Sequence, residues 1–200
     1  MAIICMKNKE NKNISVIILA AGLSQRMKTP KPFLLFNNMQ TFIEKIITEY
    51  QLFDCKNIIV VTNKELINKF KKHSNVTFVI NDKLEYGRFY SVKLGLQNIG
   101  ECDYCFVQNV DNPFIDKDIL TYIFSENLPD AFIVPCFNNK GGHPILLPKK
   151  IIDKIKNISQ NNGNFKNILN KFKNYNLSIP KSEILININS PKEYDFYFKN

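Results

Sequence analysis

The chain has 200 residues, 44% hydrophobic and 22% charged, a composition typical of a soluble globular protein of about one domain. Its net charge of +9 favours anionic partners such as nucleotides and phosphorylated small molecules, but the spread of its lysines, without a nucleic-acid-binding motif, argues against nucleic acid. The longest apolar run, about Val16 to Ala21, is too short to cross a membrane.

The first thirteen residues, MAIICMKNKENKN, place a short apolar run before a basic, Asn-rich stretch. A secretory signal peptide has the opposite order. We therefore interpret residues 1–13 as a frayed segment of a cytoplasmic protein, and residues 1–200 as one domain.

Continuous apolar runs rich in Val, Ile and Phe predict strands that are covered on both faces, at 14–20, 57–62, 76–80, 104–110 and 131–135. Apolar residues spaced every three or four positions predict helices between them, at 39–53, 64–73, 88–99 and 116–127. This alternation predicts a single doubly wound, mostly parallel sheet of Rossmann-like type.

The rhythm changes in the last third of the chain. Residues 137–150 predict a loop, a short strand and the start of a helix, and residues 161–174 a polar loop and a helix. Residues 182–197 predict a last strand that breaks into a C-terminal helix. We expect these elements to decorate one α/β domain.

The five cysteines are scattered and odd in number, which does not suggest a disulfide framework. Cys102 and Cys105 have the C-x-x-C spacing of a metal site. On a strand, however, positions i and i+3 point to opposite faces, and no second pair completes a zinc site. We predict reduced, buried, structural cysteines.

The loop AAGLSQRMKTPK follows the first strand, and ligands of open α/β sheets bind beyond the carboxyl ends of strands. Its small residues let backbone N–H groups approach an anion, and Ser24 adds a hydroxyl. Arg26 supplies a planar fork for phosphate oxygens and Lys31 a point charge. The loop matches neither the P-loop nor the dinucleotide fingerprint. The alternative is a solvated basic surface loop.

Asp111 directly follows the strand predicted at 104–110, which places its carboxylate on the same rim as the loop. Mg²⁺ prefers such oxygen ligands beside substrate phosphates. The alternative role for Asp111 is to cap the helix beginning near Asp116. Asp116 is adjacent to that helix and is the better cap, which leaves Asp111 free for a metal.

LAAGLSQRMKTPK resembles the L-A-A-G-x-S-x-R-M-G-x-x-K signature of MobA-like nucleotidyltransferases, and the whole chain resembles their molybdenum cofactor cytidylyltransferase branch. Lys28 stands where the family has Gly. The resemblance implies a nucleotide-diphospho-sugar transferase type of fold, in which Arg26 and Lys31 hold the triphosphate of CTP or another NTP. Residues 81–96 resemble a further family element that matches Asn81, Gly87 and Ser91. Together these motifs imply a nucleotide-binding set of Leu19, Ala20, Ala21, Gly22, Ser24, Arg26, Lys31, Asn81, Gly87 and Ser91.

The resemblance also implies metal and acceptor residues. Asp111 matches the family's D-x-P metal motif, and Asn187 and Asn189 stand where its second metal motif has Asp. An Asn offers Mg²⁺ or Mn²⁺ an oxygen without charge, so we expect weaker metal binding. The Gly142-His143-Pro144 run resembles the branch's acceptor-binding G-H-P element.

The function implied is Mg²⁺-dependent transfer of CMP from CTP to the phosphate of molybdenum-molybdopterin, with Arg26, Lys31 and Asp111 as catalytic residues. A molybdoenzyme or its chaperone would be a further partner. One alternative is a nucleotidyltransferase acting on a sugar phosphate or another phosphorylated acceptor. A second is a catalytically weak nucleotide-binding accessory protein, and a third a glycosyltransferase, although the D-x-D motif of that class is missing at Asp111.

Overall fold

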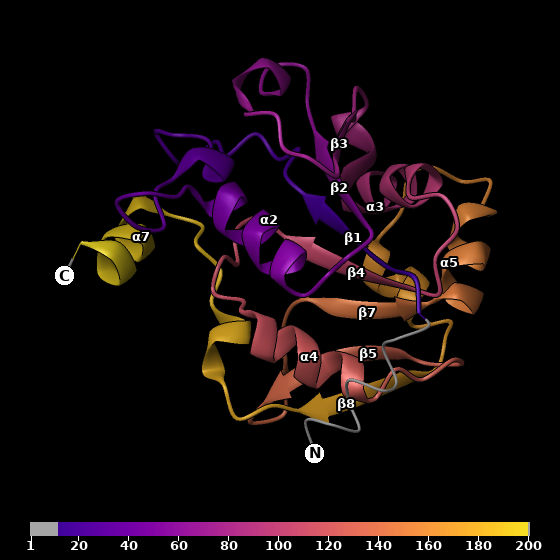
Figure 1. Cartoon of the computed structure of the whole chain (residues 1–200). Coiled ribbons are helices and arrows are strands. Elements are labelled where there is room, and N and C mark those ends of the chain that lie inside the picture. Colours follow the sequence, from indigo (N-terminus) through magenta and orange to yellow (C-terminus); the bar gives the residue numbers. More distant parts are fainter. Residues whose placement is uncertain (1–11, 200) are drawn as a thin grey trace.

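The computed structural model describes residues 12–199, which fold around one mixed sheet (Figure 1). Its strands are β1 (Ile14–Leu19), β2 (Asn57–Thr62), β3 (Val76–Ile80), β4 (Tyr104–Asn109), β5 (Phe132–Phe137), β6 (Lys140–Gly141), β7 (Ile145–Pro148) and β8 (Asn174–Ser178). The strand order is β3-β2-β1-β4-β7-β5-β6, with β8 paired to β5. The pairs from β3 to β4 are parallel, as is β5 with β8, whereas β7 pairs antiparallel with both β4 and β5.

Helices cover both faces of this sheet (Figure 1). Buried side chains of α2 (Phe42–Leu52) and α4 (Lys117–Ser125) form one core with the sheet. A second core on the opposite face contains buried side chains of α3 (Gly87–Asn98), α5 (Lys149–Lys156) and α6 (Phe165–Leu169). The prediction of a doubly wound, mostly parallel sheet is therefore confirmed.

The central strand β1 explains why both faces must be covered. Val16 and Ile18 are buried in the core on the α2 side, while Ile17 between them is buried on the α3 side. On the α3 side the helix approaches so closely that a Cβ added to Gly95 would lie 2.6 Å from Ile17 Cγ2. Such alternation, apolar on both faces, is what a continuous apolar run in a parallel sheet produces.

Two helix starts follow from local side-chain caps. Thr41 and Glu44 form a reciprocal capping box at the start of α2. The Asp116 carboxylate accepts a hydrogen bond from the Ile119 N–H, 2.7 Å away, at the start of α4. Asp116 is thus the cap of α4, as expected, and Asp111 has no part in it.

The helix predicted over 64–73 is wrong. Asn63 begins a helix-like turn, but only a short 3₁₀ helix, Ile67–Lys69, forms before Phe70 adopts an extended backbone. The Phe70 ring packs between Phe33 and Phe78, at centroid distances of 4.9 and 5.0 Å. These long-range ring contacts override the helical period.

The strand predicted at the start of residues 182–197 is also wrong. Ser182–Leu185 is a 3₁₀ helix, and the following residues are irregular up to α7 (Pro191–Phe198). The true strand is β8, Asn174–Ser178, in which only Leu177 is buried. An edge strand with one buried side chain carries no apolar run, so its sequence did not reveal it.

The four described cysteines, Cys55, Cys102, Cys105 and Cys136, are buried, as expected, and no disulfide joins any two of them. Burial raises the pKa of the Cys102 thiol to about 11, which makes it unreactive near neutral pH. The opposite-face argument was wrong, because Cys102 precedes β4 and lies in the same core as Cys105. Cys5 lies outside the described residues.

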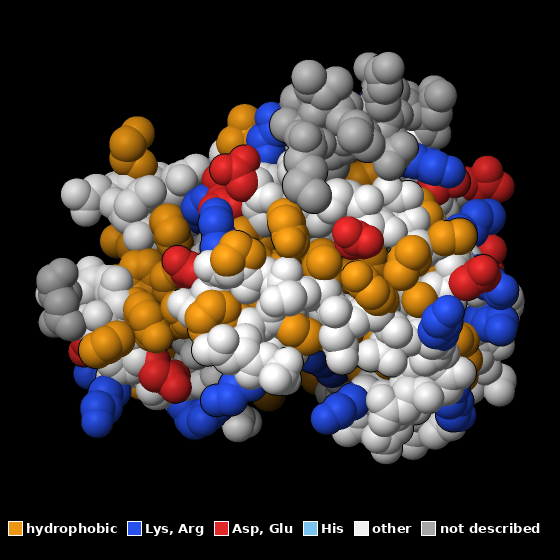
Figure 2. Space-filling view, turned by 90° about the horizontal axis from the view of Figure 1, so that it is seen from below, with side chains coloured by type: hydrophobic (Ala, Val, Ile, Leu, Met, Phe, Trp, Pro, Cys, Tyr) orange, Lys and Arg blue, Asp and Glu red, His pale blue; other side chains and the backbone are white. Residues whose placement is uncertain are grey.

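The expectation of a frayed segment over residues 1–13 largely falls outside the described residues, and Asn13 is hydrogen-bonded to the domain. Its backbone N–H donates to the Asp103 carboxylate at 2.8 Å, and its side chain to the Glu101 carbonyl. Between residues 12 and 199, none of the helices combines the length and apolarity needed to cross a bilayer. On the face shown in Figure 2, basic side chains lie mainly around the rim, interspersed with acidic ones.

Candidate functional site

A cavity of about 700 Å³ opens at the carboxyl ends of β1 and β4. The chain adds β2 and β3 on one side of β1 and then crosses to add β4 on its other side. The gap between β1 and β4 is therefore the topological switch point of the sheet. Ligands of open α/β sheets bind at such points. The lining residues are Leu19, Ala21, Gly22, Leu23, Ser24, Gln25, Arg26, Met27, Lys31, Asn81, Leu84, Gly87, Arg88, Ser91, Asn109, Val110, Asp111 and Asn189.

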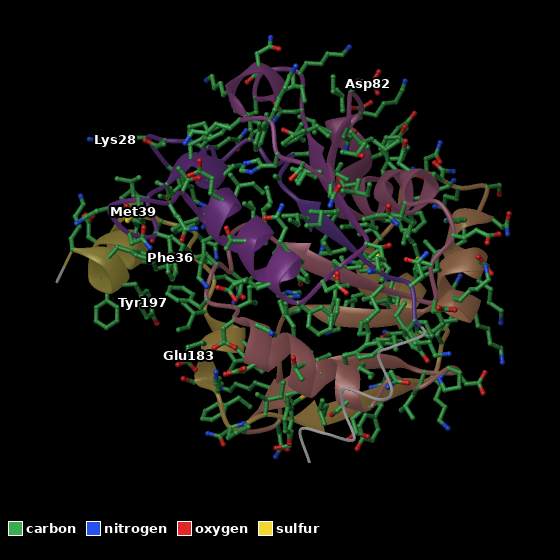
Figure 3. The ribbon with its side chains drawn as sticks, in the orientation of Figure 1. Lys28, Phe36, Met39, Asp82, Glu183 and Tyr197 are labelled. Carbon is green, nitrogen blue, oxygen red and sulfur yellow. The ribbon has the colours of Figure 1, made fainter. Side chains whose placement is uncertain are left out.

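The loop after β1 forms one wall of the cavity. Ser24 adopts a left-handed backbone with φ of 50°, and its hydroxyl accepts a hydrogen bond from the Lys31 N–H at 3.1 Å. The Asn63 side chain fixes the start of the loop by donating to the Ala21 carbonyl at 2.9 Å. Lys28, the departure from the family signature, is exposed and points outward (Figure 3). It is not among the residues that line the cavity.

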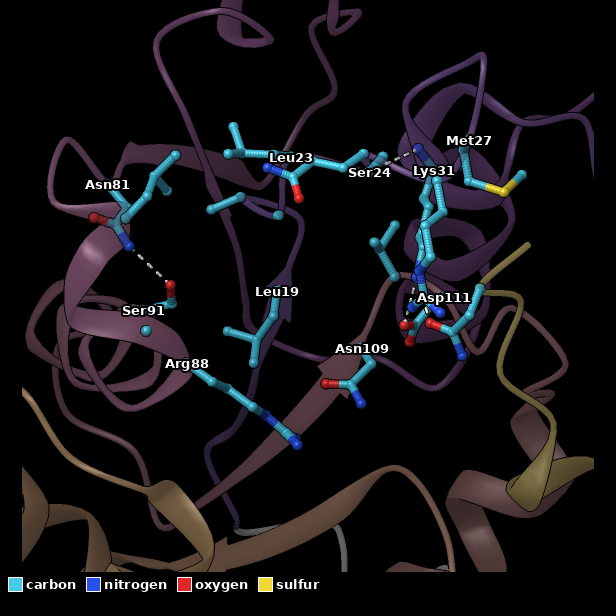
Figure 4. A pocket seen from close by; sticks show the side chains of 18 residues that line it. Leu19, Leu23, Ser24, Met27, Lys31, Asn81, Arg88, Ser91, Asn109 and Asp111 are labelled. Carbon is cyan, nitrogen blue, oxygen red and sulfur yellow. Dashed lines mark hydrogen bonds and ion pairs between the residues drawn. The ribbon is translucent and has the colours of Figure 1, made fainter. Parts of the chain in front are cut away.

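Lys31 joins three distant parts of the chain at the cavity wall (Figure 4). Its ammonium lies 3.0 Å from Asp111 Oδ2 and 2.7 Å from Asn189 Oδ1. Both Lys31 and Asp111 are mostly shielded from solvent, with side-chain exposures of 15% and 23%. One oxygen of Asp111 and one of Asn189 therefore surround the positively charged Lys31 ammonium.

The donor set at this position fits a divalent cation. Asp111 Oδ1 is buried and has no hydrogen-bond partner among the described residues, so one carboxylate oxygen is unsatisfied. Asn189 adds a neutral amide oxygen, and Mg²⁺ and Mn²⁺ both accept such ligands. Among residues 12–199 there is no group of three or more His, Cys, Asp or Glu placed to enclose a metal by themselves. A metal here would need further oxygens from its substrate.

Asn189 reaches the cavity because the segment before α7 is tied to the end of β4. The buried Asn112 amide donates to the carbonyls of Glu183 and Ile186, and the Ile188 N–H donates to the Asp111 carbonyl at 2.8 Å. Ile188 itself is buried in a small third core that joins the loop after β1 to α7. The position of Asn189 is thus set by hydrogen bonds that anchor the residues just before it.

The opposite wall is formed by the segment between β3 and α3. Asn81 is buried, and its amide donates to the Ser91 hydroxyl at 2.9 Å. Its carbonyl oxygen accepts the Lys83 N–H. Gly87, with φ of 74°, starts α3 at the cavity. The start of a helix presents backbone N–H groups that favour an anion.

Most of the nucleotide-binding residues expected from sequence line this one cavity, but Ala20 does not, because it is buried in the core behind the loop. Asn187 also lies elsewhere: it lines a separate cavity of about 470 Å³, and its amide donates to the Leu185 carbonyl. Only Asn189 of the two Asn residues is therefore placed beside Asp111.

The expected acceptor residues Gly142, His143 and Pro144 are not among those lining the cavity. Gly142 packs against the Ile184 backbone, and a cis peptide bond joins His143 to Pro144. Burial, together with the charge of Arg88, lowers the pKa of His143 to about 4, so the ring is neutral at pH 7. The same interaction indicates that His143 lies near the cavity's charged groups.

The lining residues that were missed from sequence include two polar ones outside the loop after β1, Arg88 and Asn109. Arg88 follows Gly87 at the start of a helix, and a basic residue at that point is a usable signal for an anion site. Asn109 is the last residue of β4, two positions before Asp111. Its place at the strand end was visible, but an Asn at a strand end is also a common turn residue.

The fold and this cavity together define an α/β protein with a cavity lined by charged side chains at the switch point of its sheet. The chain belongs to the MobA-like NTP transferase domain family, whose sequence profile matches residues 16–175. The family resemblance expected from the first loop is confirmed.

The chain is also similar to two curated relatives whose names describe nucleotidyltransferases. It is 29% identical over 118 residues to a 2-C-methyl-D-erythritol 4-phosphate cytidylyltransferase of Fusobacterium nucleatum, covering 54% of this chain and 50% of the relative. It is 30% identical over 128 residues to a probable molybdenum cofactor guanylyltransferase of Natranaerobius thermophilus, covering 62% and 60%. The match thus spans only about half to three fifths of these relatives.

Among solved structures, the fold resembles Rv0371c of Mycobacterium tuberculosis, with a TM-score of 0.77 and 15% identity, covering 94% of this chain and 99% of that one. A structure of the same protein in complex with manganese has a TM-score of 0.72 and 13% identity, covering 94% and 99%. At this identity the likeness concerns the fold.

Proposed function

We propose that the chain is a divalent-metal-dependent nucleotidyltransferase that transfers CMP from CTP to the phosphate of molybdenum-molybdopterin. The observation that carries the proposal is the Lys31 ammonium held between Asp111 and Asn189, beneath the loop after β1. Membership of the MobA-like family supports nucleotidyl transfer. The names of the two relatives support a cytidine nucleotide and a molybdenum cofactor separately.

The transfer is an in-line displacement at the α-phosphorus of the nucleotide. An oxygen of the acceptor phosphate forms the new P–O bond, and the bond to the oxygen bridging the α- and β-phosphates breaks. The electron pair leaves with pyrophosphate. A phosphate nucleophile is already ionised at neutral pH, so the step needs no strong general base.

The residues of the cavity contribute by positioning and charge. Arg26 and Lys31 bind the triphosphate and neutralise charge on the departing pyrophosphate. The backbone at Ala21 and Gly22 accommodates base and ribose, facing Asn81 and Ser91 across the cavity. Asp111 and Asn189 would hold Mg²⁺ or Mn²⁺, which supplies charge neutralisation between the phosphates when bound.

The first experiment is thermal unfolding with CTP, GTP, ATP and UTP, each with and without Mg²⁺. The proposal expects stabilisation by CTP that requires Mg²⁺ and disappears in Asp111→Asn. Stabilisation by another nucleotide instead of CTP would change the proposed base. No stabilisation by any nucleotide would contradict the proposal that the cavity binds a nucleotide.

Turnover separates a transferase from a binding protein. Lys31→Ala should lower pyrophosphate release by two orders of magnitude or more, roughly the effect of losing one preorganised charge at a transition state. Lys28→Ala is the matched control, because Lys28 lies on the same loop and points outward. Equal activity of the Lys31 variant and wild type would remove the role of Lys31. Nucleotide binding without pyrophosphate release would favour an accessory protein.

The acceptor could instead be a sugar phosphate or another phosphorylated small molecule. The relative named for 2-C-methyl-D-erythritol 4-phosphate supports this second candidate. Competition among molybdopterin, sugar phosphates and alcohol phosphates for pyrophosphate release distinguishes the two. A preference for a sugar or alcohol phosphate would overturn the molybdopterin assignment while leaving the transfer chemistry intact.

A further inference from the structure

Arg88 is the charged residue of the cavity to which the proposed transfer gives no role. Its side chain extends from the start of α3 toward Asn109, on the opposite side of the cavity from Leu23 and Ser24 (Figure 4). Arg88 is an exposed residue and lines the cavity. It therefore offers a fixed positive charge to whatever enters there.

The guanidinium lacks a partner of its own. Within residues 12–199 it makes no hydrogen bond or ion pair, although it carries five N–H donors. Its packing contact is the Phe165 ring, whose centroid lies 5.5 Å away. Surrounding protein lowers the pKa of Arg88 and the charge of Asp111 opposes that effect, but a guanidinium remains protonated at any physiological pH.

His143 adds a neutral polar group to the same region. The charges of Arg88 and Asp111 both act on its ring, and its Nδ1 is buried without a hydrogen-bond partner. The unpaired group that faces the cavity is therefore the Arg88 guanidinium. An anion with several oxygens would pair with its fork of N–H donors, and phosphate is such an anion.

The geometry of in-line transfer decides which phosphate Arg88 meets. The incoming oxygen and the leaving oxygen must lie on opposite sides of the α-phosphorus. If the loop after β1 and Lys31 hold the leaving pyrophosphate, the incoming group arrives from the opposite side. Arg88 lies on that side of the cavity (Figure 4).

We propose that Arg88 is a specificity-determining residue that binds the attacking phosphate of the acceptor. This inference rests on the proposed nucleotidyl transfer. It selects phosphorylated acceptors over acceptors that attack through an uncharged hydroxyl, because a hydroxyl would leave the guanidinium without a counter-charge. Arg88 thereby narrows the acceptor class while the loop and Lys31 serve the nucleotide.

The test uses inorganic phosphate as the probe of the acceptor position. The protein is first saturated with Mg²⁺ and α,β-methylene-CTP, which fills the triphosphate position and cannot react by loss of pyrophosphate. Phosphate binding is then measured by titration calorimetry for wild type, Arg88→Gln and Arg88→Lys. Lys83→Gln is the matched control, since Lys83 is exposed and does not line the cavity.

Arg88→Gln should weaken phosphate binding by about tenfold or more, as expected for a lost charge-assisted hydrogen bond, and Arg88→Lys should restore part of it. Nucleotide affinity should stay within about twofold in both variants, and Lys83→Gln should change neither affinity. Unchanged phosphate binding in Arg88→Gln, absence of phosphate binding in wild type, or an equal loss of nucleotide affinity would overturn the inference. Failure of wild type to bind any nucleotide would instead overturn the proposed function.

Discussion

Asn189 and Asn187 are two residues apart in sequence but differ in what surrounds them. Asn189 Oδ1 contacts the Lys31 ammonium beside Asp111, whereas Asn187 lines another cavity. Asn189→Asp would place a second carboxylate at the position suited to a metal. Metal affinity rises with the number of charged ligands, so we expect Mn²⁺ binding to tighten by about tenfold.

Electron paramagnetic resonance of free Mn²⁺ measures this affinity directly. Asn187→Asp adds the same charge to the same segment and serves as the control, for which we expect little change. An equal gain from both variants would mean that net charge, and not ligation at Asn189, determines binding.

His143 makes stability depend on pH in a defined direction. Its pKa is about 4 in the folded protein, against about 6.5 in an unfolded chain. The unfolded state therefore binds more protons between these values, and the free energy of unfolding falls as pH decreases from 6.5 to 4. The contribution is fully present above pH 6.5.

Urea unfolding of wild type and His143→Gln at pH 7 and pH 5 checks this dependence. Wild type should lose about 1–2 kcal/mol more than the variant over that interval. The same loss in both proteins would show that other groups cause it.

At the scale of elements, Asn112 connects the end of β4 to the segment that carries Asn189. Its fully buried amide donates to carbonyls of Glu183 and Ile186. Asn112→Ala would leave those carbonyls buried and unpaired, at a cost of about 2–4 kcal/mol in unfolding free energy. The displaced segment should also weaken nucleotide binding measured by calorimetry below the unfolding temperature.

Asn63→Ala provides the comparison for Asn112, because Asn63 is also buried but fixes the start of the loop after β1. We expect Asn112→Ala to abolish the metal dependence of nucleotide binding, which involves Asn189, and Asn63→Ala to retain it. Retained metal dependence in a folded Asn112→Ala protein would contradict the anchoring role.

The packing of α3 on β1 depends on a glycine. A Cβ at position 95 would lie 2.6 Å from the Ile17 side chain in the core between them. Gly95→Ala gains helix propensity, but overpacking should outweigh it and destabilise the protein by about 1–3 kcal/mol. Thermal unfolding of Gly95→Ala should show partial recovery when Ile17→Ala is added, whereas an additive loss would point to another cause.

Over the whole molecule, sequence patterns predicted the elements with strong buried runs. The fully covered strands β1, β2 and β4 were found, as was the placement of Asp111 beyond β4. The failures lie where a single tertiary contact decides the conformation. Phe70 leaves a helical pattern to pack between two rings, and β8 has one buried side chain.

In the candidate site, too, some residues were predicted from sequence and others were not. Its loop and Asp111 were predicted because they follow strands directly. Asn187 was assigned to the metal although it lines another cavity, because side-chain direction in an irregular segment is set by neighbours far away in sequence. Arg88 was overlooked for a different reason, since it stands at the start of a helix, where its basic side chain was a usable signal. The hydrogen bonds of Asn112 and Ile188 orient the segment around Asn189, and no local sequence pattern predicts these bonds.

The Lys31 ammonium contacts residues 80 and 158 positions further along the chain. A growing polypeptide that has emerged just past β4 can bring Lys31 to Asp111, but the segment that carries Asn189 has not yet been made. Nucleotide can stabilise the folded state only once it can bind, so the nascent chain gains no such protection until Asn189 has left the ribosome. The protein must therefore reach its native topology on packing alone, with its ligand arriving last.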